Sequence, residues 1–327
     1  MFTRKQVYYQ NIYMNNIQAK LEKIIKTGSV EKDVGISTYT TMKIGGKANF
    51  LVKTADVNEI RKLQQFCKLK KIKLFILAGG SNLIFKDEGF NGVILKVLST
   101  DFKIIEKGSR PVVEFNAGYS SHLASVKMME LGFSGFEGLY GLPGSLGGAI
   151  YQNSKWPKNN YQISDNLISL QHLDENGILN QTNRHDLEFS YGYSSFQKNN
   201  HIILSAQFEF TPKNIEEIKK HSLEVMAYRR LSQPIGVATA GCVFKNIGEE
   251  LQKKYNWPTC SAGYFIDKSG LKKTRVNNLQ ISDVHANFFV NTKSATSKDY
   301  LELVSLIKKK VKEKFGIDLK EEVRIVE

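Results

Sequence analysis

Two glycine-rich segments constrain the fold more than any other feature of this sequence. The first, Ala78-Gly79-Gly80-Ser81-Asn82, directly follows the apolar run Leu74–Leu77, and the second extends from 138 to 149. Glycine lets the backbone approach a neighbouring group closely, and backbone N–H groups at the end of a strand can surround an anion. Each segment alone is more often a turn than a ligand site. Because both follow structured elements in one region, we expect either turns or a cofactor that carries a diphosphate.

The glycine segments match none of the common nucleotide-binding or fibrous patterns. The chain contains no Gly-x-Gly, so the G-x-G-x-x-G motif is absent, and it contains no G-x-x-x-x-G-K-[ST]. Glycine recurs at every third position from 132 to 147, but interspersed aromatic residues and a single proline in so short a run exclude a collagen triple helix. The second segment is therefore expected to be a loop of close backbone approach that leads into Gly148-Ala149-Ile150.

Helical and strand patterns are mixed along the chain without a regular alternation. An apolar helical stripe that includes Cys67 predicts that this cysteine lies in a core. Helices are expected near 17–27, 57–67, 120–131, 214–230 and 300–315, and strands near 47–52, 73–77, 92–97, 111–117, 201–210 and 321–327. This mixture predicts an α+β fold.

Composition and charge exclude several classes of protein. No apolar run reaches the roughly 18 residues of a membrane span, and the N-terminus lacks the pattern of a signal peptide. Three cysteines among 327 residues favour a reducing compartment, and we expect a cytoplasmic protein without a membrane partner. The net charge of +14 would suit a nucleic acid, but the lysines are dispersed and the densest runs lie on helical patterns. We therefore expect solvated helix faces and no nucleic-acid partner.

Cys242, in the stretch ATAGCVFKN, has four possible interpretations: a nucleophile, a metal ligand, a core residue or a proton donor. The sequence contains no Cys-x-x-Cys and no His-Glu-x-x-His, and no histidine lies beside this cysteine. A nucleophile and a metal ligand are thus disfavoured, and no metal is expected. The residues alone favour a buried, inert cysteine.

Six motifs in order give the chain a resemblance to a known family. They are AGGSNLIF, GLYGLPGSLGGAIYQN, QPIGVATAGCVFKN, AGYFIDKSGLKK, HANFFVN and the terminal EEVRIV. Together they resemble the UDP-N-acetylenolpyruvoylglucosamine reductase family, also called UDP-N-acetylmuramate dehydrogenases, from about Thr38 to Glu327. The first two motifs alone would indicate only the wider vanillyl-alcohol oxidase-like class of FAD-binding domains.

The resemblance implies a fold and an activity. The fold is a two-part FAD-binding domain of the vanillyl-alcohol oxidase-like type over 31–212, after an N-terminal helical segment at 1–30, and before an α+β substrate-binding domain over 213–327. The activity is reduction of UDP-N-acetylglucosamine enolpyruvate for peptidoglycan synthesis, with FAD as cofactor and NADPH as co-substrate. The short connection after Ser190 is similar to that of the shorter type of the family, which lacks an extra tyrosine-bearing loop and is usually monomeric.

The resemblance also implies site residues. Cys242 occupies the position of the serine that donates a proton to C2 of the substrate, and Glu322 that of a catalytic glutamate. A thiol is a plausible substitute because it is mostly protonated at neutral pH and is more acidic than a hydroxyl. Substrate binding is expected from Tyr191, Lys245, Asn246 and Arg230, although Arg230 would equally suit a helix C-terminus. FAD binding is expected from Ala78, Gly79, Gly80, Ser81, Asn82, Gly141, Pro143, Gly144, Ser145, Gly147, Gly148 and Ala149.

Two departures from the family pattern leave the activity open. The family usually has Tyr-Arg-x-Ser-x-Phe, whose arginine is catalytic, whereas this chain has Gly192 after Tyr191. The segment YQNSKW at 151–156 keeps only the asparagine of the usual pattern. Cations that could compensate for the missing arginine are Arg184, Lys198, Arg229 and Arg230. The alternatives are a flavin-dependent oxidoreductase with another substrate, a catalytically impaired member of the family, or a binding protein without activity.

Overall fold

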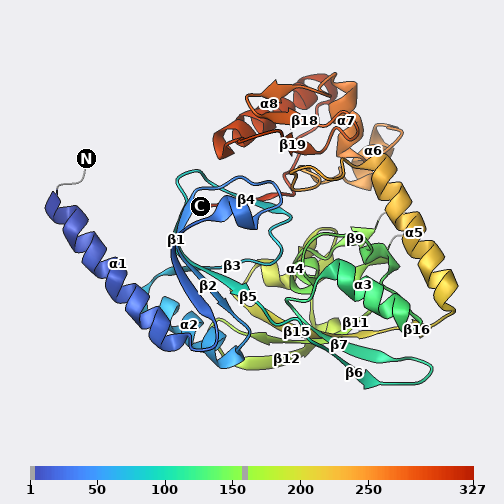
Figure 1. Cartoon of the computed structure of the whole chain (residues 1–327). Helices are drawn as coiled ribbons and strands as arrows, with labels where there is room; N and C mark the ends of the chain where they lie inside the picture. Colours follow the sequence, from blue (N-terminus) through green and yellow to red (C-terminus); the bar gives the residue numbers. More distant parts are fainter. Residues whose placement is uncertain (1–3, 157–160) are drawn as a thin grey trace.

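A four-stranded mixed sheet forms the first part of the fold (Figure 1). The computed structural model describes residues 4–156 and 161–327. The strand order is β1-β2-β5-β3, in which β1 is antiparallel to β2 and the other neighbours are parallel. Its strands are β1 (Ser29–Gly35), β2 (Lys47–Thr54), β3 (Lys73–Ile76) and β5 (Phe90–Val97), and its helices are α1 (Arg4–Ile24) and α2 (Val57–Lys70). The first glycine segment follows β3, so it lies at the carboxyl end of a parallel strand.

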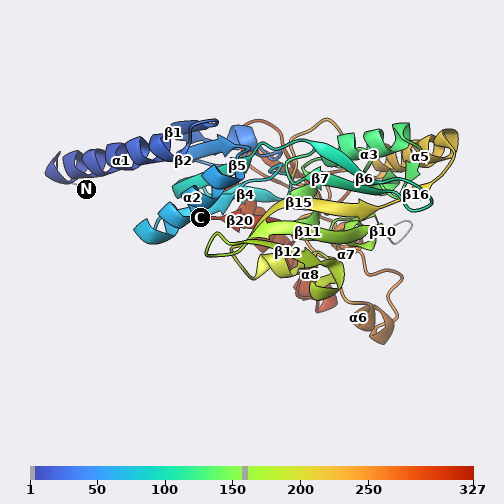
Figure 2. The same ribbon diagram turned by 90° about the horizontal axis from the view of Figure 1, so that it is seen from below.

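A five-stranded antiparallel sheet forms the second part. The order is β12-β11-β15-β7-β6, and a core of aromatic and aliphatic side chains, Phe115, Phe136 and Phe208 among them, packs between this sheet and the nearby helices. The strands are β6 (Phe102–Glu106), β7 (Val112–Asn116), β11 (Leu167–Leu173), β12 (Leu179–Asn183) and β15 (Ile202–Glu209), and the helices are α3 (Ser121–Glu130), α4 (Leu146–Gln152) and α5 (Ile215–Ser232). The second glycine segment begins after α3 and runs into the first turn of α4. Figure 2 shows α1 and α5 at opposite ends of the molecule.

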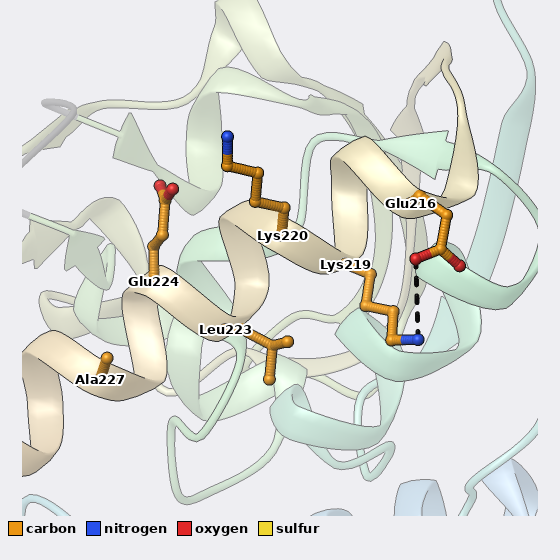
Figure 3. Close-up of a pocket in the computed structure, with 6 residues that line it drawn as sticks. All are labelled: Glu216, Lys219, Lys220, Leu223, Glu224 and Ala227. Carbon is orange, nitrogen blue, oxygen red and sulfur yellow. Dashed lines mark ion pairs between the residues drawn. The ribbon is translucent and has the colours of Figure 1, made fainter.

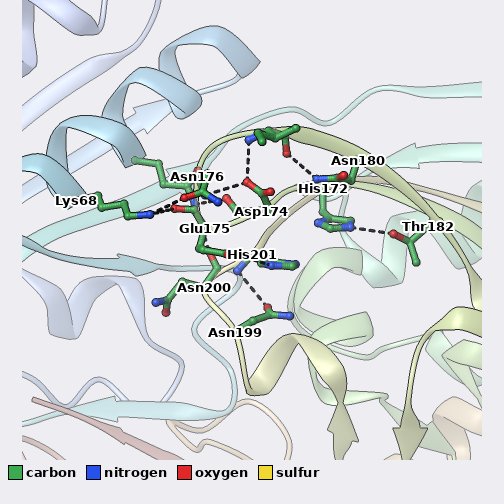
Figure 4. Close-up of polar contacts among 12 residues, drawn as sticks. Lys68, His172, Asp174, Glu175, Asn176, Asn180, Thr182, Asn199, Asn200 and His201 are labelled. Atoms are coloured by element: carbon green, nitrogen blue, oxygen red, sulfur yellow. Dashed lines mark hydrogen bonds and ion pairs between the residues drawn. The ribbon is translucent and has the colours of Figure 1, made fainter.

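A polar network and an apolar core join the two sheets. Leu173 and Ile202 of the second sheet pack in one cluster with side chains of α1, α2 and the first sheet. Around the turn after β11, Lys68 of α2 donates a hydrogen bond of 2.6 Å to Asn176 (Figure 4). Within the second sheet itself, His172 of β11 and Thr182 of β12 are 3.0 Å apart (Figure 4). The Lys68–Asn176 contact and the shared apolar core fix the two sheets relative to each other.

The C-terminal part is a small three-stranded sheet covered by helices. The longest helix of this part, α8 (Ser297–Phe315), begins at a capping box of Thr296 and Asp299 and ends at Gly316, whose φ of +70° suits glycine. Its buried stripe includes Tyr300 and Ile307, as the helical spacing predicted. The other elements are α6 (Glu249–Lys254), α7 (Ala262–Lys268), β17 (Arg275–Val276), β18 (Leu279–Ile281), β19 (Phe289–Asn291), and β20 (Arg324–Val326), which pairs in parallel with β4 (Leu83–Phe85).

Short hairpins and 3₁₀ turns complete the described fold. The short strands are β8 (Phe133–Ser134), β9 (Lys155–Trp156), β10 (Tyr161–Gln162), β13 (Phe189–Ser190), β14 (Tyr193–Ser194) and β16 (Thr211–Pro212), and the 3₁₀ turns are η1 (Ile36–Tyr39), η2 (Glu137–Leu139), η4 (Ile163–Asp165), η5 (Arg184–Asp186) and η6 (Ser195–Gln197). The hairpin of β13 and β14 carries Tyr191 and Gly192 in its turn. This turn becomes part of the site described below.

The α+β expectation is confirmed, and Cys67 is buried as predicted. The N-terminal helix ends at Ile24, earlier than the expected end near residue 27 just before Gly28, and Ser29 already pairs in β1. Helix α5 packs against α3, β8 and η2. The core of the C-terminal part, by contrast, is built from Ala240 onward and also takes in Met42, Ile44 and Ile84. We therefore propose that the structural boundary follows α5, later than residue 213.

Candidate active site

The two glycine segments meet, backbone against backbone. A Cβ added at Gly79 would lie only 2.3 Å from the Cα of Gly144, and one added at Gly148 would lie 2.9 Å from the Cβ of Ala78. Both distances are too short for real contacts, so these positions require glycine. The Ser81 hydroxyl also donates a hydrogen bond of 3.3 Å to the carbonyl of Pro143. The sequence therefore brings together two loops that are about 60 residues apart.

The first loop presents donors without acceptors. Within residues 4–156 and 161–327, the four consecutive backbone N–H groups from Gly79 to Asn82 donate no hydrogen bond. The ammonium of Lys96 lies beside them and donates to the carbonyl of Ala78 at 3.3 Å. Burial, aided by the charge of Lys53, lowers the pKa of Lys96. Unsatisfied N–H groups and a cation next to a glycine cradle suit an anionic diphosphate, so these residues fit the expected cofactor.

Helix α4 connects the second glycine loop to the β13–β14 hairpin. Its carbonyl at Tyr151 accepts a hydrogen bond of 2.7 Å from the Ser194 hydroxyl. The helix ends at Asn153 in the left-handed conformation, and the Asn153 side chain donates to the carbonyl of Ser190 at 3.0 Å. The cofactor-type loop and the turn at Tyr191 are thus held by one helix of seven residues.

The segment that contains Cys242 pairs with the C-terminal segment. The N–H of Glu322 donates to the carbonyl of Val243, and the N–H of Lys245 donates to the carbonyl of Lys320, both at 2.8 Å. The Asn82 side chain donates to the carbonyl of Glu322 at 3.2 Å. Glu322 therefore lies between the first glycine loop and the Cys242 segment.

The hairpin turn closes this arrangement from the other side. The N–H of Asn246 lies 3.4 Å from the hydroxyl of Tyr191, and the ammonium of Lys245 donates to the carbonyl of Gly192 at 3.3 Å. Residues from three distant parts of the chain thus surround one place, namely Tyr191, Gly192, Cys242, Lys245, Asn246 and Glu322. We call these six residues the central cluster.

Burial and a neighbouring carboxylate control the ionisation of the central cluster. Burial, and then the charge of Glu322, raises the pKa of Cys242, while a hydrogen bond with Asn287 opposes the rise. Burial raises the pKa of Glu322 to about 7, against the attraction of Lys245. Burial and the charge of Glu322 also raise the pKa of Tyr191. The thiol and the phenol are therefore protonated at neutral pH, and Glu322 is poised to gain or lose a proton there.

Asn287 holds the backbone on which Cys242 lies. Its amide accepts from the N–H of Phe244 at 2.9 Å and donates to the carbonyl of Phe244 at 2.7 Å. Its own carbonyl accepts from Val243 at 2.8 Å. Asn287 lies in the motif HANFFVN, but the sequence predicted no function for it or for Lys96. Both are found only once the fold shows what lies beside them.

The other expected cations lie away from the central cluster. Arg230 is exposed on the last turn of α5, and no contact in the described part of the chain joins it to the cluster. The buried Arg229 donates to the carbonyls of Gly138 and Tyr140 and lies over the ring of Trp156. Burial lowers the pKa of Arg229 to about 10. Arg229 thus supports the start of the second glycine loop.

A surface hollow on α5 offers no competing site. It is lined by Glu216, Lys219, Lys220, Leu223, Glu224 and Ala227, which all belong to this one helix (Figure 3). Glu216 and Lys219 form an ion pair of 3.8 Å at one end (Figure 3). Among the residues that the structure describes, no cluster of histidine, cysteine, aspartate or glutamate could hold a metal ion. The same residues include no helix long and apolar enough to cross a membrane.

Comparison with known proteins decides the family. The model of the C-terminal domain of UDP-N-acetylenolpyruvoylglucosamine reductase matches residues 233–326, and an FAD binding domain model matches residues 48–183. A UDP-N-acetylenolpyruvoylglucosamine reductase from Protochlamydia amoebophila is 36% identical over 312 residues, which are 95% of this chain and 97% of that protein. The chain belongs to the UDP-N-acetylenolpyruvoylglucosamine reductase family.

Two further relatives agree with this family. A reductase of the same name from Bacillus cereus is 36% identical over 91% of this chain and 97% of its own length. The crystal structure of the Thermus caldophilus reductase superimposes with a TM-score of 0.75 at 29% identity, over 92% of this chain and all of that chain. The expected FAD-binding domain followed by an α+β C-terminal domain is confirmed, and the protein is an FAD-dependent oxidoreductase of this family.

Proposed function

We propose that this protein reduces UDP-N-acetylglucosamine enolpyruvate to UDP-N-acetylmuramate with NADPH and FAD, as a step in peptidoglycan precursor synthesis. The observation that carries the proposal is the meeting of Cys242, Glu322 and Lys245 beside the glycine cradle. A protonated thiol, a carboxyl group with a pKa of about 7 and an ammonium are the groups that reduction of an enol ether next to a carboxylate requires.

FAD supplies the redox chemistry when bound, because it accepts a hydride from NADPH and delivers one to C3 of the vinyl group. The free N–H groups at 79–82 and the ammonium of Lys96 would hold its diphosphate. Gly141, Pro143, Gly144, Ser145, Gly147, Gly148 and Ala149 would line the opposite wall.

Cys242 donates the proton that completes the reduction. Hydride addition at C3 places negative charge on C2 and on the adjoining carboxylate, and C2 then takes the proton of the Cys242 thiol. This forms a C–H bond and leaves a thiolate, which recovers a proton from solvent. The raised pKa keeps the thiol protonated before the reaction, and it also favours rapid reprotonation afterwards.

The remaining groups of the central cluster position the substrate. We propose that Tyr191 and Asn246, which contact each other across the domain junction, contact the UDP-sugar. Glu322 lies close enough to Cys242 to raise its pKa, so its own protonation state regulates the proton donor. We propose that the exposed Arg230 contacts the phosphates of the UDP group, which lie farther from the central cluster.

The sequence predicted a flavin-binding region over 31–212 and a substrate-binding region over 213–327; we propose instead that the flavin-binding region extends through α5 and that the substrate-binding region begins after Ser232. We further propose a monomer that acts in the cytoplasm and binds neither membrane nor nucleic acid. The lysine-rich runs at 68–73 and 308–312 support the last point, because they lie on or directly after the helices α2 and α8.

The proposal is tested with the purified, flavin-loaded protein. Oxidation of NADPH is followed by the loss of its absorbance, with and without UDP-N-acetylglucosamine enolpyruvate. We expect turnover that depends on this substrate and a product whose mass has increased by two hydrogens. Flavin-loaded protein that oxidises NADPH without any effect of the enolpyruvyl compound would refute the assignment, and rapid turnover of an alcohol instead would indicate another substrate.

A further inference from the structure

Gly192 and Lys245 share one small region of space. Gly192 adopts a φ of +61° in the β13–β14 turn, and a Cβ added there would lie 3.4 Å from the Nζ of Lys245 and 3.5 Å from its Cε. The carbonyl of Gly192 accepts the hydrogen bond from the same ammonium at 3.3 Å. A Cβ at 192 would therefore be in ordinary van der Waals contact with the end of Lys245, and a longer side chain there would compete with it for the same region.

The Lys245 ammonium has donors to spare. It forms no ion pair within the described residues, and the carbonyl of Gly192 is the acceptor that these residues provide for its side chain. An ammonium carries three N–H donors, so two remain for a ligand. The side chain is half-buried, which makes an unpaired charge there costly unless an anion arrives.

Other cations near the FAD-type subdomains are already engaged. Arg184 donates to the carbonyls of Ser164 and Leu187, and Lys198 pairs with Glu188 at 3.4 Å. Arg229 is held by two carbonyls at the start of the second glycine loop. Within the described structure, none of these three extends to the central cluster.

Lys245 also acts on the carboxyl group of the cluster. Its backbone N–H bonds to Lys320, two residues before Glu322, and its charge lowers the pKa of Glu322 against the effect of burial. The attraction supports the geometric argument that the ammonium and the carboxyl group share one site with Cys242.

We propose that Lys245, held by the Gly192 carbonyl, supplies the positive charge that binds the substrate carboxylate and stabilises the charge that develops on it. The proposal rests on the proposed function, and it explains how a chain with glycine at 192 remains active. A cation fixed in place before the reaction stabilises developing charge without reorganisation.

The first test removes the charge. Lys245→Met keeps the length of the side chain, and Lys320→Met makes the same change of net charge on the paired, exposed position nearby. We expect Lys245→Met to lower kcat by about 10²–10³-fold and to raise KM for the enolpyruvyl substrate. Lys320→Met should stay within about twofold of the wild type, since surface charges contribute little. Flavin reduction by NADPH in a stopped-flow experiment should be unchanged in Lys245→Met, because no carboxylate of the enolpyruvyl compound takes part.

The pH dependence of kcat/KM separates a loss of charge from a structural defect, because a structural defect alone would not shift the pKa of Glu322. Removal of the ammonium leaves the burial of Glu322 unopposed, so the pKa of Glu322, about 7 in the intact site, should rise. The corresponding limb of the kcat/KM profile should shift to higher pH in Lys245→Met. A profile that keeps its shape while activity falls would contradict the proposal.

The second test restores the positive charge from position 192, which lies next to the end of Lys245. The double variant Gly192→Arg, Lys245→Met is compared with Gly192→Ala, Lys245→Met. Both carry the strain of a side chain at positive φ, but only the first has a cation. We expect the arginine double variant to regain at least tenfold in kcat over the alanine one. Equal activities of the two would overturn the proposal. Failure of the proposed function is distinct, because the wild-type protein would then show no substrate-dependent turnover at all.

Discussion

Replacement of Glu322 by glutamine tests how far the central cluster is buried. A carboxyl group whose pKa rises from 4.5 to about 7 on folding retains its proton in the native state when the unfolded chain has already lost it. The native state therefore binds more protons between these pH values, and the free energy of unfolding falls as pH rises through this window. At about 1.4 kcal/mol per pH unit, ionised Glu322 costs the native state about 3 kcal/mol above pH 7.

Glutamine remains neutral and nearly isosteric, so the Glu322→Gln variant avoids this cost. We expect it to match the wild type near pH 4.5 and to exceed it by about 3 kcal/mol at pH 8. The measurement is the urea midpoint of the flavin-loaded proteins at several pH values, with equal m-values required. Glu321→Gln is the matched control, because Glu321 pairs with Lys308 at 2.6 Å and its removal should give no gain at high pH. A stability difference between Glu322→Gln and wild type that does not change with pH would refute the reasoning.

Three further predictions concern the cofactor cradle and the proton donor. Gly79→Ala should yield protein without bound flavin, because its Cβ would collide with the backbone of Gly144. Gly35→Ala is the control and should retain bound flavin, because a Cβ at Gly35 meets open space. Equal flavin content in the two variants would contradict the assignment of the glycine cradle. Lys96→Met should weaken FAD binding about tenfold in a fluorescence titration, since a charge-assisted hydrogen bond to the diphosphate is lost, and an unchanged dissociation constant would exclude that contact. Cys242→Ser should remain active, whereas Cys242→Ala should allow reduction of flavin by NADPH but slow its reoxidation by substrate; normal turnover of the alanine variant would show that the proton comes from another group.

Much of the fold could be predicted because its signals are local. The helix with Tyr300 and Ile307 follows apolar periodicity, and the burial of both residues confirmed it. The strand before Ala78 was indicated by a continuous apolar run and forms β3. The sites of tight backbone contact were indicated by glycine, although only the structure shows that Gly79 and Gly144 meet. The end of the first helix was placed too late because Gly28 lies in the connection to β1 rather than at the helix terminus.

The central cluster could be predicted only in part because it forms through contacts between distant segments. Cys242 and Glu322 were identified through motifs, but the effect of Glu322 on the pKa of Cys242 depends on backbone pairing between residues 243 and 322. The position of Lys245 at Gly192 depends on a positive φ, which glycine indicates, and on one carbonyl oxygen, which leaves no signal in the sequence. For Arg230 the sequence left two roles open, substrate binding or a helix C-terminus. The structure places this arginine exposed at the end of α5.

The most direct test of the central claim is single-turnover reoxidation of the reduced flavin. The purified protein is reduced with one equivalent of NADPH without oxygen and mixed with UDP-N-acetylglucosamine enolpyruvate while flavin absorbance is recorded. We predict that the oxidised flavin spectrum returns within seconds, together with UDP-N-acetylmuramate that carries one solvent-derived hydrogen at C2. Flavin that stays reduced after addition of the enolpyruvyl substrate, yet reoxidises in air, would contradict the account.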